Sequence, residues 1–218
     1  SGVDVLDLFS RNYSEGQSAF LSTDVINAYS TLCGLRHRSR AYVFPNFTYE
    51  LYSNKLAGLG GRGRGQNAES IAIAQIKLQL IDIGDKSCLM FPIVDKKGLH
   101  FVLAVVDLRS NQFVLLDSVD DTPVQLIAYA EEIQSLMKFG YGRDVAYVDG
   151  VESPVQENSR DCGVFVCAEI NIIDWYFAQP TTSLTHMPLT YLKYMLSFVQ
   201  AADMMKWRKQ IMLDLVRG

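Results

Sequence analysis

The chain has 218 residues, of which 49% are hydrophobic and 20% charged, and its formal net charge is −4 at pH 7. A chain of this size buries about 70% of its unfolded surface, so we expect one folded domain spanning residues 1–218. The acidic balance argues against general nucleic-acid binding, which needs a basic face, and no apolar run reaches the roughly 18 residues of a membrane span. No charged-then-apolar leader opens the chain, so we expect an intracellular protein, and we expect it to be a monomer. Ser1-Gly2 is typical of a cloning remnant.

The first half of the chain alternates helix and strand patterns. Apolar side chains recur with helical spacing over residues 22–32, and Ser22 or Thr23 is suited to cap this helix. A short strand is predicted over residues 41–44, and helices over residues 47–56 and 68–80.

Between these two helices, residues 57–66 hold five glycines and two arginines without apolar periodicity. Such a segment cannot pack as core, so we predict a mobile surface loop. Gly58, Gly60 and Gly63 match a G-x-G-x-x-G pattern, but a helical pattern precedes them and no P-loop lysine follows. We therefore do not interpret the loop as a nucleotide site.

The second half begins with three consecutive apolar strands, predicted over residues 88–94, 100–108 and 113–117, the last two joined by a polar turn. A helix over 123–138, a short strand over 145–148 and a polar loop lead to a helix over 162–177. Two more helices are predicted over 189–198 and 202–216. Meandering strands flanked by helices predict an α+β fold.

Cys162 stands where a polar loop turns into this apolar helix. A sulfur at a helix start lies near unpaired backbone N–H groups and the positive end of the helix dipole, which favours a thiolate nucleophile. The alternative is that Cys162 is a small buried apolar residue, the interpretation that we give to Cys33, Cys88 and Cys167. The four cysteines and three histidines form no C-x-x-C pair or ligand cluster, so zinc and a disulfide scaffold are not expected.

Three more residues suggest that Cys162 belongs to a thiol hydrolase. His100 opens one predicted strand, Asp117 closes the next, and Gln156 stands shortly before the cysteine. Alone, a histidine beside a strand is usually structural, and an aspartate after a strand is usually a turn residue. Asp117 has rivals nearby, but it is the best placed of the aspartates at the end of its strand.

These residues carry a resemblance to a known family, because they occur in the same order as its blocks. His100-Phe101, Asp117-Ser118, Gln156 and Asp161-Cys162-Gly163 resemble the His-Trp, Asp-Ser, Gln and Asp-Cys-Gly blocks of the Ulp/SENP family of ubiquitin-like-protein proteases, clan CE. Phe20-Leu21-Ser22-Thr23 is similar to its amino-terminal Trp-Leu-Asn-Asp block, and Lys206-Trp207-Arg208 stands where a carboxy-terminal helix with a tryptophan is expected.

The resemblance implies a single papain-like protease domain whose central, mostly antiparallel sheet is flanked by helices. It makes Cys162 the nucleophile, His100 its base, Asp117 the residue that orients the imidazole, and Gln156 the oxyanion donor. No metal or cofactor is required. The residues that the resemblance assigns to substrate binding are Phe20, Thr23, Phe101 and Asp161.

Departures from the family pattern concern the substrate more than the chemistry. Phe20 and Phe101 replace tryptophans that cover the channel for the modifier's Gly-Gly tail, and Thr23 replaces an acidic residue. These departures resemble the divergent bacterial effector branch, many of whose members cleave ubiquitin, so a deubiquitinase is our first hypothesis. A SUMO- or NEDD-type protease is the near alternative, followed by a clan CE acetyltransferase and an inactive modifier-binding module.

Overall fold

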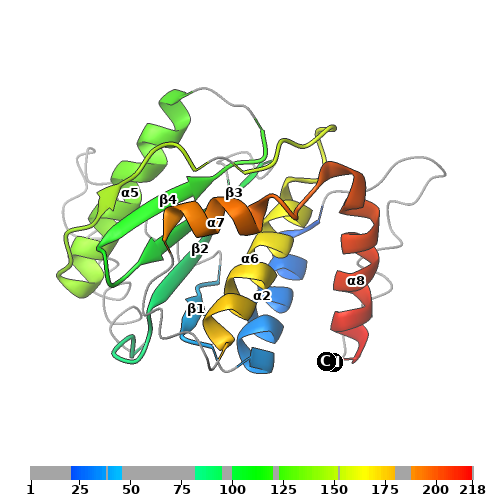
Figure 1. The fold of residues 1–218 in the computed structure, drawn as a ribbon, viewed down its shortest axis with the longest axis horizontal. Helices are drawn as coiled ribbons and strands as arrows, with labels where there is room; N and C mark the ends of the chain where they lie inside the picture. Colours follow the sequence, from blue (N-terminus) through cyan, green and yellow to red (C-terminus); the bar gives the residue numbers. More distant parts are fainter. Residues whose placement is uncertain are drawn as a thin grey trace, which may run out of the picture.

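The protein is described by a computed structural model, and the structure describes residues 21–37, 39–45, 82–94, 100–119, 123–151, 153–179 and 188–217. Within these residues five strands form one sheet, and helices cover it (Figure 1). The strands are β1 (Ala41–Val43), β2 (Cys88–Val94), β3 (Phe101–Asp107), β4 (Gln112–Leu116) and β5 (Ala146–Tyr147). The helices are α2 (Thr23–His37), α5 (Pro123–Tyr141), α6 (Cys162–Ala178), α7 (Leu189–Leu196) and α8 (Met204–Arg217), with a 3₁₀ turn at Ala201–Asp203.

The strands lie in the sheet in the order in which they occur along the chain. The long central strands β2, β3 and β4 pair antiparallel, over seven residue pairs between β2 and β3 and five between β3 and β4. The short outer strands pair parallel, β1 with β2 and β5 with β4. The predicted α+β fold with an antiparallel centre is therefore confirmed, and both edges of the sheet are parallel.

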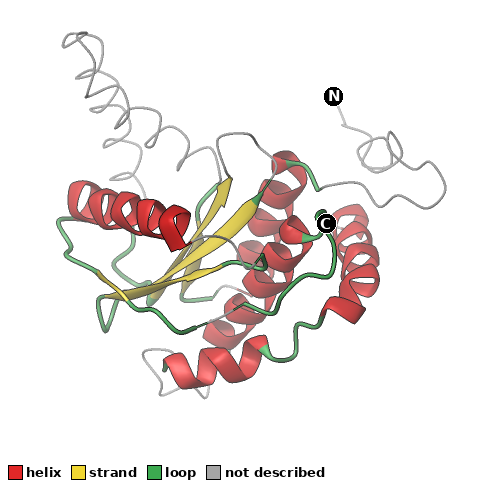
Figure 2. Ribbon diagram, turned by 90° about the horizontal axis from the view of Figure 1, so that it is seen from above, coloured by secondary structure: helices red, strands yellow, loops and turns green. Residues whose placement is uncertain are grey.

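Both faces of the sheet are buried, which explains why the central strands read as continuous apolar runs. Successive side chains of β3 point to opposite faces, so Leu103 packs into a core with α2, α6, α7 and α8, whereas Val102 packs into a second core with α5. Figure 2 shows the helices on both sides of the twisted sheet.

Helix α6 is the central helix of the larger core. Thirteen of its 17 residues are buried, and its first turn lies against the first turn of α2. Figure 1 shows α6 and α2 side by side, with α8 beside them. In the described residues no helix is long and apolar enough to cross a membrane.

Most predicted elements within the described residues form where the pattern placed them, and β2 matches residue for residue. Two boundaries differ at the site: His100 lies just before β3, and Asp117 lies just after β4. At the carboxy terminus, the 3₁₀ turn occupies the first residues of the predicted helix, so α8 begins at Met204. The predicted helices over 47–56 and 68–80, the loop over 57–66 and Phe20 lie outside the described residues.

Candidate active site

The antiparallel pairing of β3 and β4 brings the start of one strand beside the end of the other. Leu103 pairs with Leu116, so His100 and Asp117 flank the same end of this ladder. The His100 Nε2 lies 2.7 Å from Asp117 Oδ1, and the two side chains are 13% and 7% exposed. The same carboxylate oxygen accepts the Val119 backbone N–H at 2.9 Å, which holds it in place for the imidazole.

Cys162 is the first residue of α6 and is buried, at 1% exposure. Its side chain hydrogen-bonds to His100. Because the His100 Nε2 is bonded to Asp117, the other ring nitrogen, Nδ1, is the one available to the sulfur. Three chain segments, the start of β3, the end of β4 and the start of α6, thus bring Cys162, His100 and Asp117 together.

The electrostatics of this group favour a charged imidazole. Burial lowers the pKa of His100, but hydrogen bonds and charge attraction from Asp117 and Cys162 outweigh burial and raise that pKa to about 10. His100 is therefore an imidazolium at neutral pH. This cation faces the Cys162 side chain at the start of α6.

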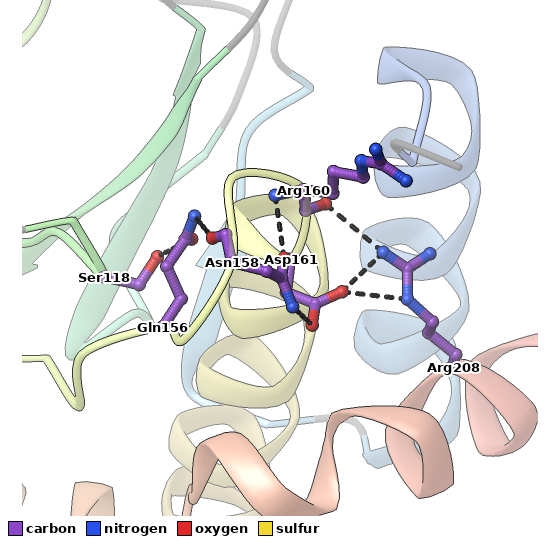
Figure 3. Close-up of polar contacts among 6 residues, drawn as sticks. All are labelled: Ser118, Gln156, Asn158, Arg160, Asp161 and Arg208. Carbon is purple, nitrogen blue, oxygen red and sulfur yellow. Dashed lines mark hydrogen bonds and ion pairs between the residues drawn. The ribbon is translucent and has the colours of Figure 1, made fainter. Parts of the chain in front are cut away.

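Gln156 is held beside the end of β4 by its backbone and its side chain (Figure 3). Its backbone N–H donates to the Ser118 carbonyl at 2.8 Å, and its Oε1 accepts the Ser118 hydroxyl at 2.8 Å. The Nε2 group donates to the Asn158 carbonyl oxygen. These bonds turn the Oε1 of the amide toward Ser118 and its Nε2 toward the Asn158 carbonyl, and the role of Gln156 as oxyanion donor stays a prediction.

Asp161 precedes the cysteine and joins α6 to α8. Its carboxylate accepts hydrogen bonds from Arg208, with Nε–Oδ1 and Nη2–Oδ1 distances of 2.9 and 2.5 Å, and from Asn158 Nδ2 at 2.7 Å (Figure 3). Arg208 Nη2 also donates to the Arg160 carbonyl at 3.2 Å. Asp161 is 6% exposed and makes no side-chain cap, so its carboxylate faces Arg208 rather than the helix start. Its assignment to substrate binding stays a prediction.

Close packing around position 163 explains why a glycine follows the cysteine. A Cβ placed there would lie 3.0 Å from Ile26 Cδ1, 3.2 Å from Leu21 Cβ and 3.6 Å from Phe101 Cδ2. The absence of a side chain thus lets the first turn of α6 approach α2 and Phe101. Phe101 is 3% exposed against this turn, and the half-buried Thr23 starts α2 two residues after Leu21. Phe101 thus lies next to the cysteine's neighbour, and the roles of Phe101 and Thr23 in substrate binding stay predictions.

The other three cysteines have a different environment. Cys33, Cys88 and Cys167 are free thiols and at most 1% exposed, as predicted. Burial raises the pKa of the Cys33 thiol to about 12 and the pKa values of the other two well above the ordinary value. These thiols are therefore poor nucleophiles. Within the described part of the chain, no three His, Cys, Asp or Glu side chains form a group that could hold a metal ion.

A second buried acid lies further along the cysteine helix. Glu169 follows Cys162 by seven residues, two helical turns, and is 1% exposed. Its Oε1 accepts the Ser153 hydroxyl at 2.5 Å, so it ties α6 to the segment that carries Gln156. Burial, together with repulsion from Asp117, raises the pKa of Glu169 to about 8, despite the opposing effect of the Ser153 hydrogen bond.

Sequence reasoning missed Arg208 and Glu169, although both gave a signal. Met204, Arg208, Ile211 and Asp214 recur with helical spacing and are the buried residues of α8, so two charged side chains, Arg208 and Asp214, stand on the buried face of this helix. Glu169 likewise stands in a helix that is buried almost throughout. A buried charged side chain requires a partner, which would have identified both positions as part of a polar network.

Comparisons with known proteins show the family of the chain. A sequence model described as the Ulp1 protease family, C-terminal catalytic domain, matches residues 20–206. A protein of Arabidopsis thaliana named NEDD8-specific protease 1 is 29% identical over 104 residues. That alignment covers 44% of the chain and 45% of the Arabidopsis protein, so the match spans less than half of this relative.

Solved structures share the fold at low sequence identity. The C-terminal Ulp1 protease domain in complex with Smt3, the yeast SUMO, has a TM-score of 0.61 at 18% identity, covering 90% of this chain and 77% of that one. The Xanthomonas campestris effector XopD bound to ubiquitin has a TM-score of 0.55 at 16% identity, covering 88% and 98%. At these identities the structures establish a shared fold.

Proposed function

The chain belongs to the Ulp1 protease family, and from this premise we propose that it is a cysteine isopeptidase that cleaves after the carboxy-terminal Gly-Gly of ubiquitin or a ubiquitin-like modifier. The observation that carries this proposal is the arrangement of three side chains. Cys162 is buried at a helix start and is hydrogen-bonded to His100, whose Nε2 lies 2.7 Å from Asp117 Oδ1. This is the spatial relation of nucleophile, base and orienting carboxylate that thiol hydrolysis requires.

The reaction follows from these positions. The Cys162 thiolate attacks the glycine carbonyl carbon, forming a C–S bond, and the oxygen becomes an oxyanion. The Gln156 amide and the Cys162 backbone N–H, which lies at the positive end of α6, donate hydrogen bonds to that oxyanion. The His100 imidazolium passes its proton to the leaving amine as the C–N bond breaks, and Asp117 keeps the ring oriented. Water, deprotonated by His100, then hydrolyses the thioester and releases the modifier.

For the modifier, we propose ubiquitin first. The supporting observations are Thr23 and Phe101, which differ from the acidic residue and the tryptophan of the family's blocks; Phe101 stands beside the first turn of α6. A NEDD-type modifier is the second candidate, supported by the similarity to the Arabidopsis NEDD8-specific protease. The Ulp1 protease domain was solved in complex with the yeast SUMO, so a SUMO-type modifier is included in the test as a third candidate.

The test is labelling by ubiquitin, SUMO and NEDD8 probes that carry a carboxy-terminal electrophile. We expect the ubiquitin probe to add its mass to Cys162, which peptide mass spectrometry locates, and Cys162→Ala to abolish labelling. Cys33→Ala is the matched control and should still be labelled, because Cys33 is a buried free thiol away from the site. Failure of all three probes to label the folded protein, or labelling of Cys162→Ala, would contradict the proposed activity.

Kinetics of a Gln156 variant test the oxyanion assignment. Gln156→Ala should lower kcat about 100- to 1,000-fold with little change in KM, because an oxyanion donor acts in the transition state. Gln179→Ala is the control, since Gln179 donates to the Trp175 carbonyl at the opposite end of α6. A raised KM with unchanged kcat in Gln156→Ala would make Gln156 a binding residue instead.

A further inference from the structure

A basic pocket of about 370 Å³ lies at the end of the sheet opposite the cysteine. Its walls come from four parts of the chain: the residue before β1, the segment before β2, the turn after β3 and the loop after α5. The polar lining side chains are Arg40, Asp85, Lys86, Arg109 and Arg143. Among the residues that the structure describes, four cations and one acid thus converge in one hollow of a chain whose formal net charge is −4.

The cations are held for different reasons. Arg143 is fixed at the pocket wall, because its Nη1 donates to the Leu108 carbonyl at 2.7 Å and to Asn111 Oδ1 at 3.1 Å. Lys86 pairs with Asp85 at 3.2 Å, but this carboxylate is 76% exposed and neutralises little inside the pocket. Within the segments that the structure describes, no hydrogen bond or ion pair engages the side chains of Arg40 and Arg109.

The position of Arg40 comes from its backbone rather than from its side chain. The Arg40 carbonyl accepts the backbone N–H groups of Ser87 and Cys88 at 2.7 and 3.3 Å, which joins the start of β1 to the start of β2. The Arg109 backbone N–H likewise donates to Asp107 Oδ1 at 2.9 Å, in the turn after β3. The geometry of the sheet and the turn therefore brings the positive charges of Arg40 and Arg109 to the same pocket. No side-chain contact from the described residues compensates these charges, and a bound anion would relieve the repulsion between them.

We propose that this pocket binds a small phosphorylated molecule with two or more phosphate groups. Three of the four cations are arginines, whose planar guanidinium groups bind phosphate oxygens in a bidentate manner. The volume falls within the range of small-molecule sites, at its lower end. A nucleic acid needs an extended basic face, and a local pocket in an acidic chain does not offer one.

The site is separate from the candidate active site. His100 precedes β3 and Arg109 follows it, and the seven residues of this strand alone span about 23 Å. A ligand in the pocket therefore does not occupy the position of the cleaved bond, and the proposal goes beyond the proposed function without depending on it.

Binding of inorganic tripolyphosphate to the whole protein, measured by isothermal titration calorimetry and by melting temperature at constant ionic strength, tests the proposal. We expect saturable binding at one site and a concentration-dependent rise of the melting temperature. The double variant Arg40→Gln/Arg109→Gln should bind at least about tenfold more weakly, because charge-assisted contacts to phosphate are strong. It should fold normally, since the bonds that place both residues are made by backbone atoms.

Arg217→Gln is the matched control, because Arg217 is exposed at the end of α8, and it should bind tripolyphosphate like the unmodified protein. An oligoglutamate peptide of similar charge is the second ligand and should bind more weakly than tripolyphosphate. The proposal is overturned by the absence of saturable binding, by equal weakening in Arg217→Gln and the double variant, or by oligoglutamate binding as tightly as tripolyphosphate.

Discussion

Arg208 is expected to be the residue outside the reacting group on which the cysteine helix depends most. In Arg208→Met, the Asp161 carboxylate loses both guanidinium bonds, of 2.9 and 2.5 Å, and keeps the Asn158 amide. Both members of the ion pair are at most 10% exposed, so the variant leaves a buried charge without its counter-ion. Breaking a buried pair in this way costs about 3–5 kcal/mol of unfolding free energy. Methionine is the test residue because its unbranched side chain fills the space of the arginine stem.

The loss should also reach the site, because Asp161 is directly joined to the nucleophile. The Asp161 carbonyl accepts the Val164 and Phe165 backbone N–H groups at 2.8 and 2.9 Å, which starts α6. If the carboxylate moves toward water, the first turn of α6 and the Cys162 sulfur move with it. We therefore expect a lower kcat for Arg208→Met even when rates are corrected for the folded fraction.

Urea unfolding of a double-mutant cycle measures the pair. Arg208→Met and Asp161→Asn should each destabilise the protein, and the double variant should be more stable than the sum of the two effects predicts, by at least about 1 kcal/mol. Lys209→Met is the control: Lys209 is the exposed neighbour on α8, and its replacement should change stability by less than about 0.5 kcal/mol. A coupling near zero, or an Arg208→Met effect as small as that of the control, would refute the reasoning.

Three further variants or conditions test the surroundings of the cysteine. Gly163→Ala should destabilise the protein by about 1–3 kcal/mol in urea unfolding, because its Cβ would lie 3.2 Å from Leu21 Cβ, and an effect below about 0.5 kcal/mol would show that α2 adjusts freely. For Glu169, whose pKa is raised to about 8 by burial, the unfolded chain ionises at lower pH than the folded one, so stability should fall as pH rises from about 4.5 to 8. Glu169→Gln keeps an acceptor for Ser153 and should reduce this slope in urea midpoints at pH 5 and 8, whereas an unchanged slope would place the cause elsewhere. Because the pKa of His100 is raised to about 10, kcat/KM should stay high to about pH 9 and fall near pH 10, and a fall centred near pH 7 would contradict the imidazolium.

The central strands were predictable because burial on both faces leaves a strong local signal. An apolar run of seven residues, bounded by polar segments, gave β2 to the residue. The outer strands were also predicted, over residues 41–44 and 145–148, but their parallel pairing was not predictable in the same way. Strand β5 has two residues and β1 has three, and each is paired with its neighbour through contacts that depend on the whole chain. A pattern within so few residues does not specify the direction of pairing.

In the candidate site, too, the residues with a local sequence signal were predicted, whereas those defined by long-range contacts were not. The order of His100, Asp117, Gln156 and Cys162 along the chain was sufficient to select them, since each stands at the start or end of a strongly patterned element or in a polar loop. The residues that hold them in place were not selected, because their partners are distant in sequence: Arg208 is 47 residues from Asp161.

The signal for such supporting residues is nevertheless present in the sequence as an inconsistency. A buried helix face that holds Met204 and Ile211 should not also hold Arg208 and Asp214, unless oppositely charged side chains from other elements meet them there. The sequence pattern thus predicts that Arg208 has a charged partner, and only the fold identifies this partner as Asp161, the neighbour of the nucleophile. A charged residue on the buried face of a helix therefore helps to identify the residues that hold the site in place, even when it lies far along the chain from the reacting residues.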